Sequence, residues 1–157
     1  LAIALNPSLA IADEPTTALD VIVQDRVLDI LKDLSVKHDM ALILVTHDLS
    51  IVLERCDNVF VMYAGYQVEY GKNRELYMSP KHPYTQGLLN SIPNIELNYQ
   101  KLTAIPGSPP DLLNMPIGCP FSPRCPYAMD VCKMKLPPLL RLESGHLVRC
   151  FLYGGVQ

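Results

Sequence analysis

The sequence lacks several features that would place it at once in a class of proteins. None of its apolar runs approaches the ~20 residues that a helix needs to cross a bilayer, so a membrane-spanning chain is not expected. Its glycines stand at positions 65, 71, 87, 107, 118, 145, 154 and 155. None of them has the G-x-x-x-x-G-K-[ST] spacing of a phosphate-binding loop, so no complete site of that kind is expected within this chain.

Proline, cysteine and charge are distributed unevenly. Of 14 prolines and five cysteines, twelve prolines and four cysteines lie at or after Pro80. Residues 1–78 carry 6 basic and 12 acidic groups, whereas residues 79–157 carry 7 basic and 4 acidic ones. This shift predicts a domain boundary between residues 78 and 79. The basic excess of the second part is too small to indicate a nucleic-acid partner.

The first third of the chain has the pattern of a strand, a helix and a second strand. Leu9–Ala12 and Ala41–Val45 are short apolar runs, as expected for strands that are buried on both faces of a sheet. Apolar residues recur every three or four positions between Asp20 and His38, with Asp20 as the expected N-cap. We therefore predict an α/β fold in which the two strands are parallel neighbours.

Shorter elements are predicted after this unit. We expect a short helix over 49–55, a hairpin over 58–71 and two short helices within 72–80 and 83–92. Beyond Pro93 the periodic pattern fades. The Pro- and Gly-rich segments there predict irregular structure that is held together by something other than a large core.

Polar residues follow both predicted strands. Asp13 and Glu14 come directly after the first strand, and Thr46, His47 and Asp48 follow the second. Ligands of open α/β sheets bind at the carboxyl ends of the strands, so we expect the acid pair and the histidine to lie close together. An acid pair alone is a weak indication, because every buried strand must leave the core somewhere. Together with the histidine it favours a site for a metal or a phosphate.

These motifs resemble those of the ATPase subunits of ABC transporters. "IADEPTTALD" resembles their Walker B strand and D-loop, "LILVTHDLS" their switch-histidine segment, and "LAIALNP" the helix that follows their signature sequence. Later segments are similar to the oligopeptide/dipeptide importer subgroup, whose C-terminal extension is named after the triplet His82-Pro83-Tyr84: "VMYAGYQVEYG", "SPKHPYTQGLLNSIP" and "IPGSPPDLL…GCPFSPRCPYAMDVC". The resemblance implies part of a P-loop NTPase parallel sheet with flanking helices in residues 1–78. It implies a Pro/Cys-rich irregular extension in residues 79–157.

The resemblance also implies a role for each polar residue. Asp13 would hold the Mg²⁺ of Mg-ATP, Glu14 would orient or deprotonate the attacking water, and His47 would contact the γ-phosphate. Phosphoryl transfer depends on charge stabilisation and an in-line water, which such a set supplies. Asp20, in the D-loop, would act across the interface of two ATPase subunits. A plain helix cap is an equally good interpretation of Asp20.

What the sequence lacks also separates it from the family. Besides the phosphate-binding loop, it has neither the Gly-rich ABC signature nor an upstream aromatic residue to stack on adenine. We therefore expect a C-terminal fragment of a longer ATPase that cannot hydrolyse ATP by itself.

Four cysteines form a second group of candidate ligands: Cys119, Cys125, Cys132 and Cys150. Their separations of five, six and seventeen residues are not those of a zinc knuckle. Disulfides are rare in the reducing cytosol, where such an ATPase would lie. A [4Fe–4S] cluster tolerates varied spacing, and the resemblance implies one, because some members of the family carry it on this extension. The cluster, zinc and unligated thiols all stay open.

Two further residues have side chains of types that can bind a metal. His146 could replace a cysteine as a zinc ligand, but we expect it in a surface loop. Cys56 is expected to be a small packed residue.

The resemblance implies an ATP-hydrolysing subunit that drives the import of oligopeptides or dipeptides. Such a subunit would lie on the cytoplasmic face of the membrane, bound to transmembrane permease subunits and to a second, identical or different, ATPase subunit. An external peptide-binding protein would act with it indirectly. Two alternatives remain: a non-catalytic metal-binding or interaction module, and a non-transport ABC ATPase such as a DNA-repair protein. The His-Pro-Tyr segment and the weak charge argue against nucleic acid as a partner.

Overall fold

The computed structural model describes residues 3, 5–92, 104–143 and 145–154. The chain forms two compact units, Leu1–Asp48 and Leu49–Gln157. This division comes earlier than the compositional boundary between residues 78 and 79, because the hairpin that follows Leu49 packs with the C-terminal segments. Each unit is described by itself.

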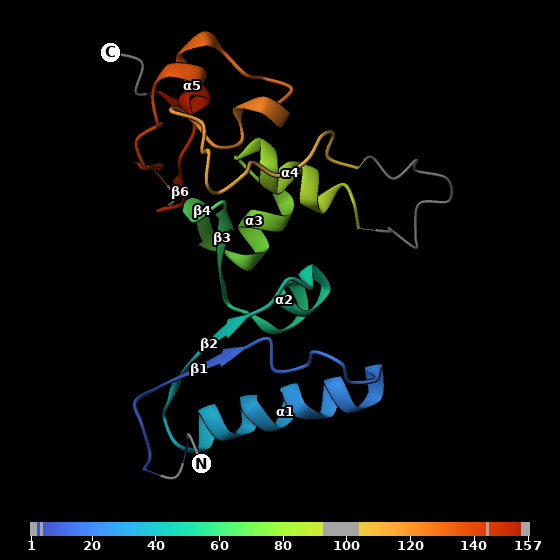
Figure 1. The fold of residues 1–157 in the computed structure, drawn as a ribbon. Helices are drawn as coiled ribbons and strands as arrows, with labels where there is room; N and C mark the ends of the chain where they lie inside the picture. Colours follow the sequence, from blue (N-terminus) through green and yellow to red (C-terminus); the bar gives the residue numbers. More distant parts are fainter. Residues whose placement is uncertain (1–2, 4, 93–103, 144, 155–157) are drawn as a thin grey trace. The chain divides into compact units, whose positions relative to one another are not determined.

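The first unit is a strand, a helix and a strand, as the periodicity predicts. It consists of β1 (Leu9–Asp13), α1 (Val21–Lys37) and β2 (Ala41–Val45) (Figure 1). The two strands pair in parallel along their whole length. Asp20 caps α1, because its side chain accepts a hydrogen bond from the backbone N–H of Val23.

The expectation that both strands are buried on two faces is wrong for this structure. Alternate side chains of each strand are exposed, among them Leu9, Ile11, Ile43 and Val45. The register places Ile11 opposite Ile43, so these two side chains share one face of the sheet. In the described part of this unit α1 is the one helix that packs against the strands. The apolar side chains on the other face therefore stay uncovered.

The second unit begins with the predicted short elements. They are α2 (Leu49–Arg55), β3 (Asn58–Tyr63), β4 (Tyr66–Lys72), α3 (Asn73–Met78) and α4 (Pro83–Leu89). The strands β3 and β4 form an antiparallel hairpin, and Pro83 opens α4 as the sequence predicts.

Asn73 connects two of these helices. Its side-chain amide donates to the carbonyl oxygens of Val52, Leu53 and Cys56 at 2.8–3.2 Å. These carbonyls lie at or just after the end of α2, where a helix leaves acceptors without intrahelical partners. One side chain at the start of α3 therefore fixes the end of α2.

The C-terminal segments contain regular elements that the sequence pattern does not reveal. They are η1 (Ser122–Arg124), α5 (Asp130–Met134), β5 (Leu140–Arg141), β6 (Leu147–Val148) and η2 (Phe151–Tyr153). β6 joins the hairpin, so the antiparallel sheet has the order β3-β4-β6-β5. Elements of two to five residues are too short to show a period of 2 or 3.6.

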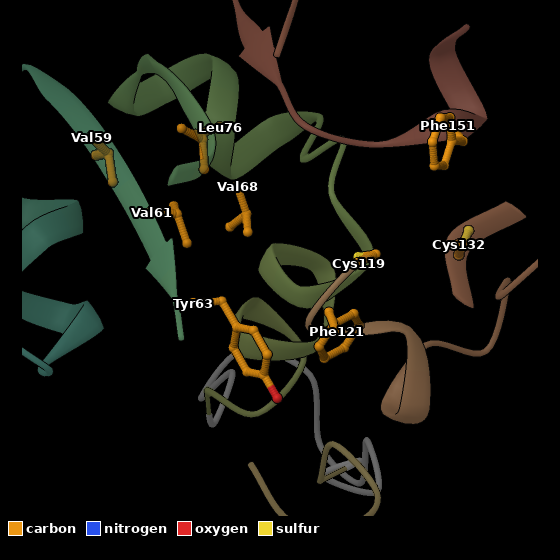
Figure 2. Packing of buried hydrophobic residues seen from close by; sticks show 9 residues of the cluster. All are labelled: Val59, Val61, Tyr63, Val68, Leu76, Cys119, Phe121, Cys132 and Phe151. Atoms are coloured by element: carbon orange, nitrogen blue, oxygen red, sulfur yellow. The ribbon is translucent and has the colours of Figure 1, made fainter. Parts of the chain in front are cut away.

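The C-terminal segments share one hydrophobic core with the hairpin, which corrects the expectation that something other than a core holds them. The core residues are Val59, Val61, Tyr63, Val68, Leu76, Cys119, Phe121, Cys132 and Phe151 (Figure 2). Tyr63 packs on the rings of Tyr84 and Phe121, with ring centroids 4.6 and 5.2 Å apart. Aromatic contacts of this kind contribute roughly 0.5–1.5 kcal/mol beyond burial.

The helix that the resemblance implies at the start of the chain falls partly outside the described residues. Leu1, Ala2 and Ala4 are not described, and Ile3 and Leu5 lie in turns. In the part of the chain that the structure describes, no helix has the length and apolar character needed to cross a membrane.

Candidate functional site

The acid pair and the histidine meet at the carboxyl ends of the two parallel strands. Asp13 ends β1, and the backbone N–H of the next residue, Glu14, donates to the carbonyl oxygen of Val45 at 2.8 Å. This bond holds Glu14 beside the end of β2. His47 follows that end, and its Nδ1 lies 2.9 Å from Oε1 of Glu14.

The turn after β1 positions the Glu14 carboxylate. Glu14 has φ 44° and Ala18 has φ 65°, a left-handed conformation that is costly for residues other than glycine. The Thr17 hydroxyl donates to Oε2 of Glu14 at 2.9 Å. His47 and Thr17 thus hold the two carboxylate oxygens of Glu14. Thr17 was not among the predicted site residues, although its place in the "TTALD" turn three residues after Glu14 could have indicated it.

Glu14 and His47 change each other's pKa although both side chains are exposed. The exposed fraction of the side chain is 44% for Glu14 and 81% for His47. The hydrogen bond to His47 lowers the pKa of Glu14, and the bond from Thr17 lowers it further. The bond to Glu14 and its negative charge raise the pKa of His47. Glu14 is therefore ionised at neutral pH, and His47 stays protonated to a higher pH than an isolated histidine.

Asp13 and Asp20 lie in the same unit but do not join this pair by any hydrogen bond that the described residues show. Asp13 is exposed at the end of β1. Oδ1 of Asp20 bonds the amide of Val23 at 3.0 Å, so its observed contact is that of a helix cap. A role of Asp20 at an interface between subunits stays a prediction.

The four candidate cysteine ligands, which lie far apart in the sequence, line a single cavity in the second unit. Its other lining residues are His82, Pro83, Phe121, Ser122, Tyr127, Met129, Pro137, Phe151 and Leu152. The backbone N–H of Cys119 donates to the carbonyl oxygen of Cys132 at 2.7 Å, which joins two of the cysteine segments. Gly118 permits this approach, because a Cβ there would lie 2.2 Å from the same carbonyl oxygen.

Burial disfavours the ionised form of these thiols. It raises the pKa of Cys119 and Cys125 and brings that of Cys150 to about 11. The charges of neighbouring cysteines raise the pKa values further. A bound metal would oppose this effect, since it binds the thiolate form and releases the proton.

The described residues contain no group of three or more His, Cys, Asp or Glu side chains that is arranged to hold a metal ion. A tetrahedral zinc site needs four sulfur atoms at about 2.3 Å from one centre. The four cysteines line one cavity but do not form such a group among the described residues. A metal at these cysteines stays a prediction.

His82 is a lining residue that the sequence reading did not select. Its side chain is 1% exposed, and burial lowers its pKa to about 4, so the ring is neutral at pH 7. Its Nδ1 accepts a hydrogen bond from the backbone N–H of Tyr84 at 3.1 Å, which caps α4. The Pro83 that follows it could have indicated this capping position.

His146 is not the surface residue that was expected. It is 2% exposed, and its Nε2 lies 2.6 Å from Oε1 of the fully buried Glu69. Glu69 also accepts hydrogen bonds from the backbone N–H groups of Lys81 and His82 at 2.6 and 2.9 Å. Glu69 is a further residue that the sequence reading missed, and it connects β4, the start of the His-Pro-Tyr segment and the loop before β6.

Residues 68–132 match the family model described as "Oligopeptide/dipeptide transporter, C-terminal region". This range contains the His-Pro-Tyr triplet and three of the four cavity cysteines.

Curated relatives match over nearly the whole chain. The chain is 53% identical to an oligopeptide transport ATP-binding protein of Bacillus subtilis, over 98% of this chain and 47% of the relative. It is 48% identical to an oligopeptide transport ATP-binding protein of Salmonella typhimurium, over 96% of this chain and 45% of the relative. It is 46% identical to a dipeptide transport ATP-binding protein of Bacillus subtilis, over 97% of this chain and 45% of the relative.

The chain thus spans about half the length of the curated relatives that it matches. Along nearly all of its residues, the chain is similar to oligopeptide and dipeptide transport ATP-binding proteins.

Proposed function

We propose that this chain supplies the hydrolytic residues of an ATP-hydrolysing subunit that drives the import of oligopeptides or dipeptides. The observation that carries the proposal is the hydrogen bond between Glu14 and His47 at the carboxyl ends of β1 and β2. Ligands of open α/β sheets bind at this edge. The names of the relatives, which are transport ATP-binding proteins, support this function and do not favour a DNA-repair ATPase.

Three side chains have distinct roles in this proposal. Asp13 presents a hard oxygen donor of the kind that Mg²⁺ prefers, and bound Mg²⁺ would neutralise phosphate charge. Glu14, ionised through its bond to His47, accepts hydrogen bonds from the attacking water. His47 uses Nδ1 for Glu14, which leaves Nε2 for an oxygen of the γ-phosphate.

The remaining parts of the nucleotide site come from outside these 157 residues, because the sequence contains no phosphate-binding loop. We infer that the working subunit pairs with a second ATPase subunit, to which Asp20 contributes, and binds permease subunits at the cytoplasmic face of the membrane. An external peptide-binding protein supplies the peptide.

A chimaera tests the proposal. The part of the Salmonella relative that precedes the matched region is fused to this chain, and the fusion replaces the relative in a strain that lacks it. We expect Mg²⁺-dependent ATP hydrolysis by the purified fusion and uptake of peptides by the cells. The 157-residue chain alone is expected to show no hydrolysis.

Two variants of the fusion make the test specific to the proposed site. Glu14→Gln should lower ATP hydrolysis by roughly 10²-fold or more, the range for the loss of a general base. Asp33→Asn, on α1 of the same unit, should leave hydrolysis unchanged. A stable fusion in which Glu14→Gln is as active as the unchanged protein contradicts the proposed role of Glu14.

We also infer that the four cavity cysteines hold a [4Fe–4S] cluster, with zinc as the alternative. Four thiols around one cavity provide the soft donors that both groups require. Iron, sulfide and zinc analysis of the anaerobically produced chain distinguishes the two, and a colourless protein with bound zinc rules the cluster out.

A further inference from the structure

We propose that Thr17 is a positioning residue of the proposed hydrolytic site, and that its hydroxyl fixes the direction in which the Glu14 carboxylate meets the attacking water. The inference deepens the proposed function and rests on it. Its basis is that the two carboxylate oxygens of Glu14 are bound by two different side chains, Thr17 and His47.

The Glu14 carboxylate is bound at both of its oxygens. Oε2 accepts a hydrogen bond from the Thr17 hydroxyl at 2.9 Å, and Oε1 lies 2.9 Å from Nδ1 of His47. An ionised carboxylate only accepts hydrogen bonds, so both partners donate. Each oxygen keeps a further acceptor site for a water molecule, and the side chain of Glu14 is exposed, so water reaches it.

One of these bonds alone would not fix the direction of the carboxylate. The last torsion of a glutamate side chain has a broad minimum. With His47 as the one donor, the carboxylate can still turn about the oxygen that His47 holds. A donor on the second oxygen prevents this rotation. The two bonds together therefore determine where the remaining acceptor sites of Glu14 lie.

The backbone holds Thr17 beside Glu14. The backbone N–H of Thr17 donates to the carbonyl oxygen of Glu14 at 3.2 Å, which closes a turn. The N–H of Glu14 donates to the carbonyl oxygen of Val45 at 2.8 Å, and this bond attaches the turn to the end of β2. The N–H of Leu19 donates to the carbonyl oxygen of Thr16 at 3.2 Å and continues the turn toward α1. The Thr17 hydroxyl thus has a defined place relative to the sheet.

Two further features of the turn indicate more than a connection between β1 and α1. Glu14 and Ala18, on either side of Thr17, have positive φ angles of 44° and 65°. Residues other than glycine adopt this conformation at a cost, and such costs are concentrated at functional sites. Thr17 is also exposed, so water is an alternative partner for its hydroxyl and burial does not impose the bond to Glu14.

Positioning of this kind acts on the rate of hydrolysis and hardly on ATP binding. The direction of the acceptor matters when the water attacks, so its loss lowers kcat and leaves KM nearly unchanged. A part that only stabilised the fold of the turn would not produce this separation between kcat and KM.

Two substitutions at Thr17 separate the hydroxyl from the rest of the side chain. Thr17→Val keeps the branched shape and removes the donor, whereas Thr17→Ser keeps the donor and removes the methyl group. Thr85→Val is the matched control, because the Thr85 hydroxyl has no hydrogen-bond partner among the described residues. The same chemical change therefore breaks no bond at position 85. All three variants are made in the fusion with the Salmonella relative.

The readouts are kcat and KM for ATP in the fusion, and the vicinal scalar couplings of the Glu14 side chain by NMR in the 157-residue chain. We expect Thr17→Val to lower kcat roughly tenfold with KM within about twofold of that of the unchanged fusion. In the same variant, the Glu14 couplings should average over several rotamers. Thr17→Ser and Thr85→Val should keep kcat within about twofold of the unchanged value.

The outcomes are distinguishable. An unchanged fusion without Mg²⁺-dependent hydrolysis overturns the proposed function and the role of Thr17 with it. An active fusion whose kcat is the same in Thr17→Val overturns the role of Thr17 alone. Equal losses of kcat in Thr17→Ser and Thr17→Val also contradict the proposal, since the hydroxyl is then not the cause. If Thr17→Val does not fold, Thr17→Ala replaces it, and Glu14 couplings that stay as in the unchanged chain overturn the proposal.

Discussion

At the scale of single residues, Glu14 and His47 stabilise each other's charge although both are exposed to solvent. Their bond lowers the pKa of the carboxyl and raises that of the imidazole. Glu14 contributes stability above its unfolded pKa, and this is lost as the pH falls through its lowered folded pKa. The His47 contribution is present below its unfolded pKa and is lost as the pH rises through its raised folded pKa. The pair is therefore most favourable between these two limits.

The substitution Glu14→Gln should bring the pKa of His47 down toward its ordinary value, because the negative partner is gone. The measurement is an NMR titration of the His47 ring. Asp39→Asn, which removes a carboxylate of the same unit that does not contribute to the His47 shift, serves as the control. An unchanged His47 pKa in Glu14→Gln would mean that the bond does not form in solution.

Gly118 is a single residue on which the thiol cavity depends. A Cβ there would meet three backbone atoms at 2.2–2.9 Å, and backbone cannot move aside as a side chain can. Gly118→Ala should lower the free energy of unfolding by about 1–3 kcal/mol or prevent folding. Chemical denaturation of Gly118→Ala and of the unchanged chain measures this loss of unfolding free energy.

Gly87→Ala is the matched variant for this prediction. Its Cβ would lie 2.7 Å from Cγ1 of Ile105, a side-chain atom that can shift, and alanine favours the helix by up to about 1 kcal/mol. We expect a clearly smaller loss than for Gly118→Ala. Equal losses of unfolding free energy for the two variants would show that the close approach of Gly118 to the backbone of Cys132 is not the reason why an alanine at position 118 is costly.

At the scale of elements, one buried carboxylate joins segments that are distant in the sequence. Glu69 on β4 bonds His146, which is 77 residues later, and the backbone of Lys81 and His82. A buried carboxylate is retained only when its oxygens have partners of this kind. The start of α4 and the position of β6 therefore both depend on Glu69.

Glu69→Gln should lower the free energy of unfolding by about 3–5 kcal/mol, because it leaves buried partners without the acceptor that they require. Denaturation of Glu69→Gln, His146→Gln and the double variant forms a cycle, and we expect the two losses to be strongly non-additive. Asp130→Asn breaks an exposed pair with Lys133 and should cost at most about 1 kcal/mol. Additive losses at Glu69 and His146 would contradict a direct bond.

At the scale of the whole molecule, the two compact units differ in how well their sheets are protected. The first unit has two parallel strands with one apolar face exposed, whereas the second has a four-stranded antiparallel sheet over a shared core. Small sheets with one uncovered face are marginally stable in water. We therefore predict that the first unit unfolds at a lower free energy than the second unit.

Amide hydrogen exchange followed by NMR tests this prediction. The backbone amides of β1 and β2 should exchange much faster than those of β3 and β4, because the first unit opens at a lower free energy. In the chimaera with the longer relative, we expect the exchange of β1 and β2 to slow. Equal protection of both sheets in the 157-residue chain would show that the first unit is stable as it stands.

Much of the fold can be predicted from local patterns. The bounds of α1, β2, α2 and β3 follow from periodicity, and the cap by Asp20 and the turn at Ala64-Gly65 follow from residue type. The meeting of Glu14 and His47 is also predictable, since it needs only a parallel strand–helix–strand order. The partners of Glu69 and the burial of His146 are not predictable, because no periodic pattern links residues so far apart.

The sequence by itself determined the strand–helix–strand unit, the acid–histidine pair and the similarity to transport ATP-binding proteins, because each depends on short segments whose residue types and spacing suffice. Only the tertiary structure decided that four dispersed cysteines and His82 line one cavity, and that the C-terminal segments share a core with the hairpin. These arrangements depend on close packing between distant segments, such as Gly118 against Cys132, and on the pairing of buried polar groups. Such contacts are properties of the folded chain and have no counterpart in the local order of residues.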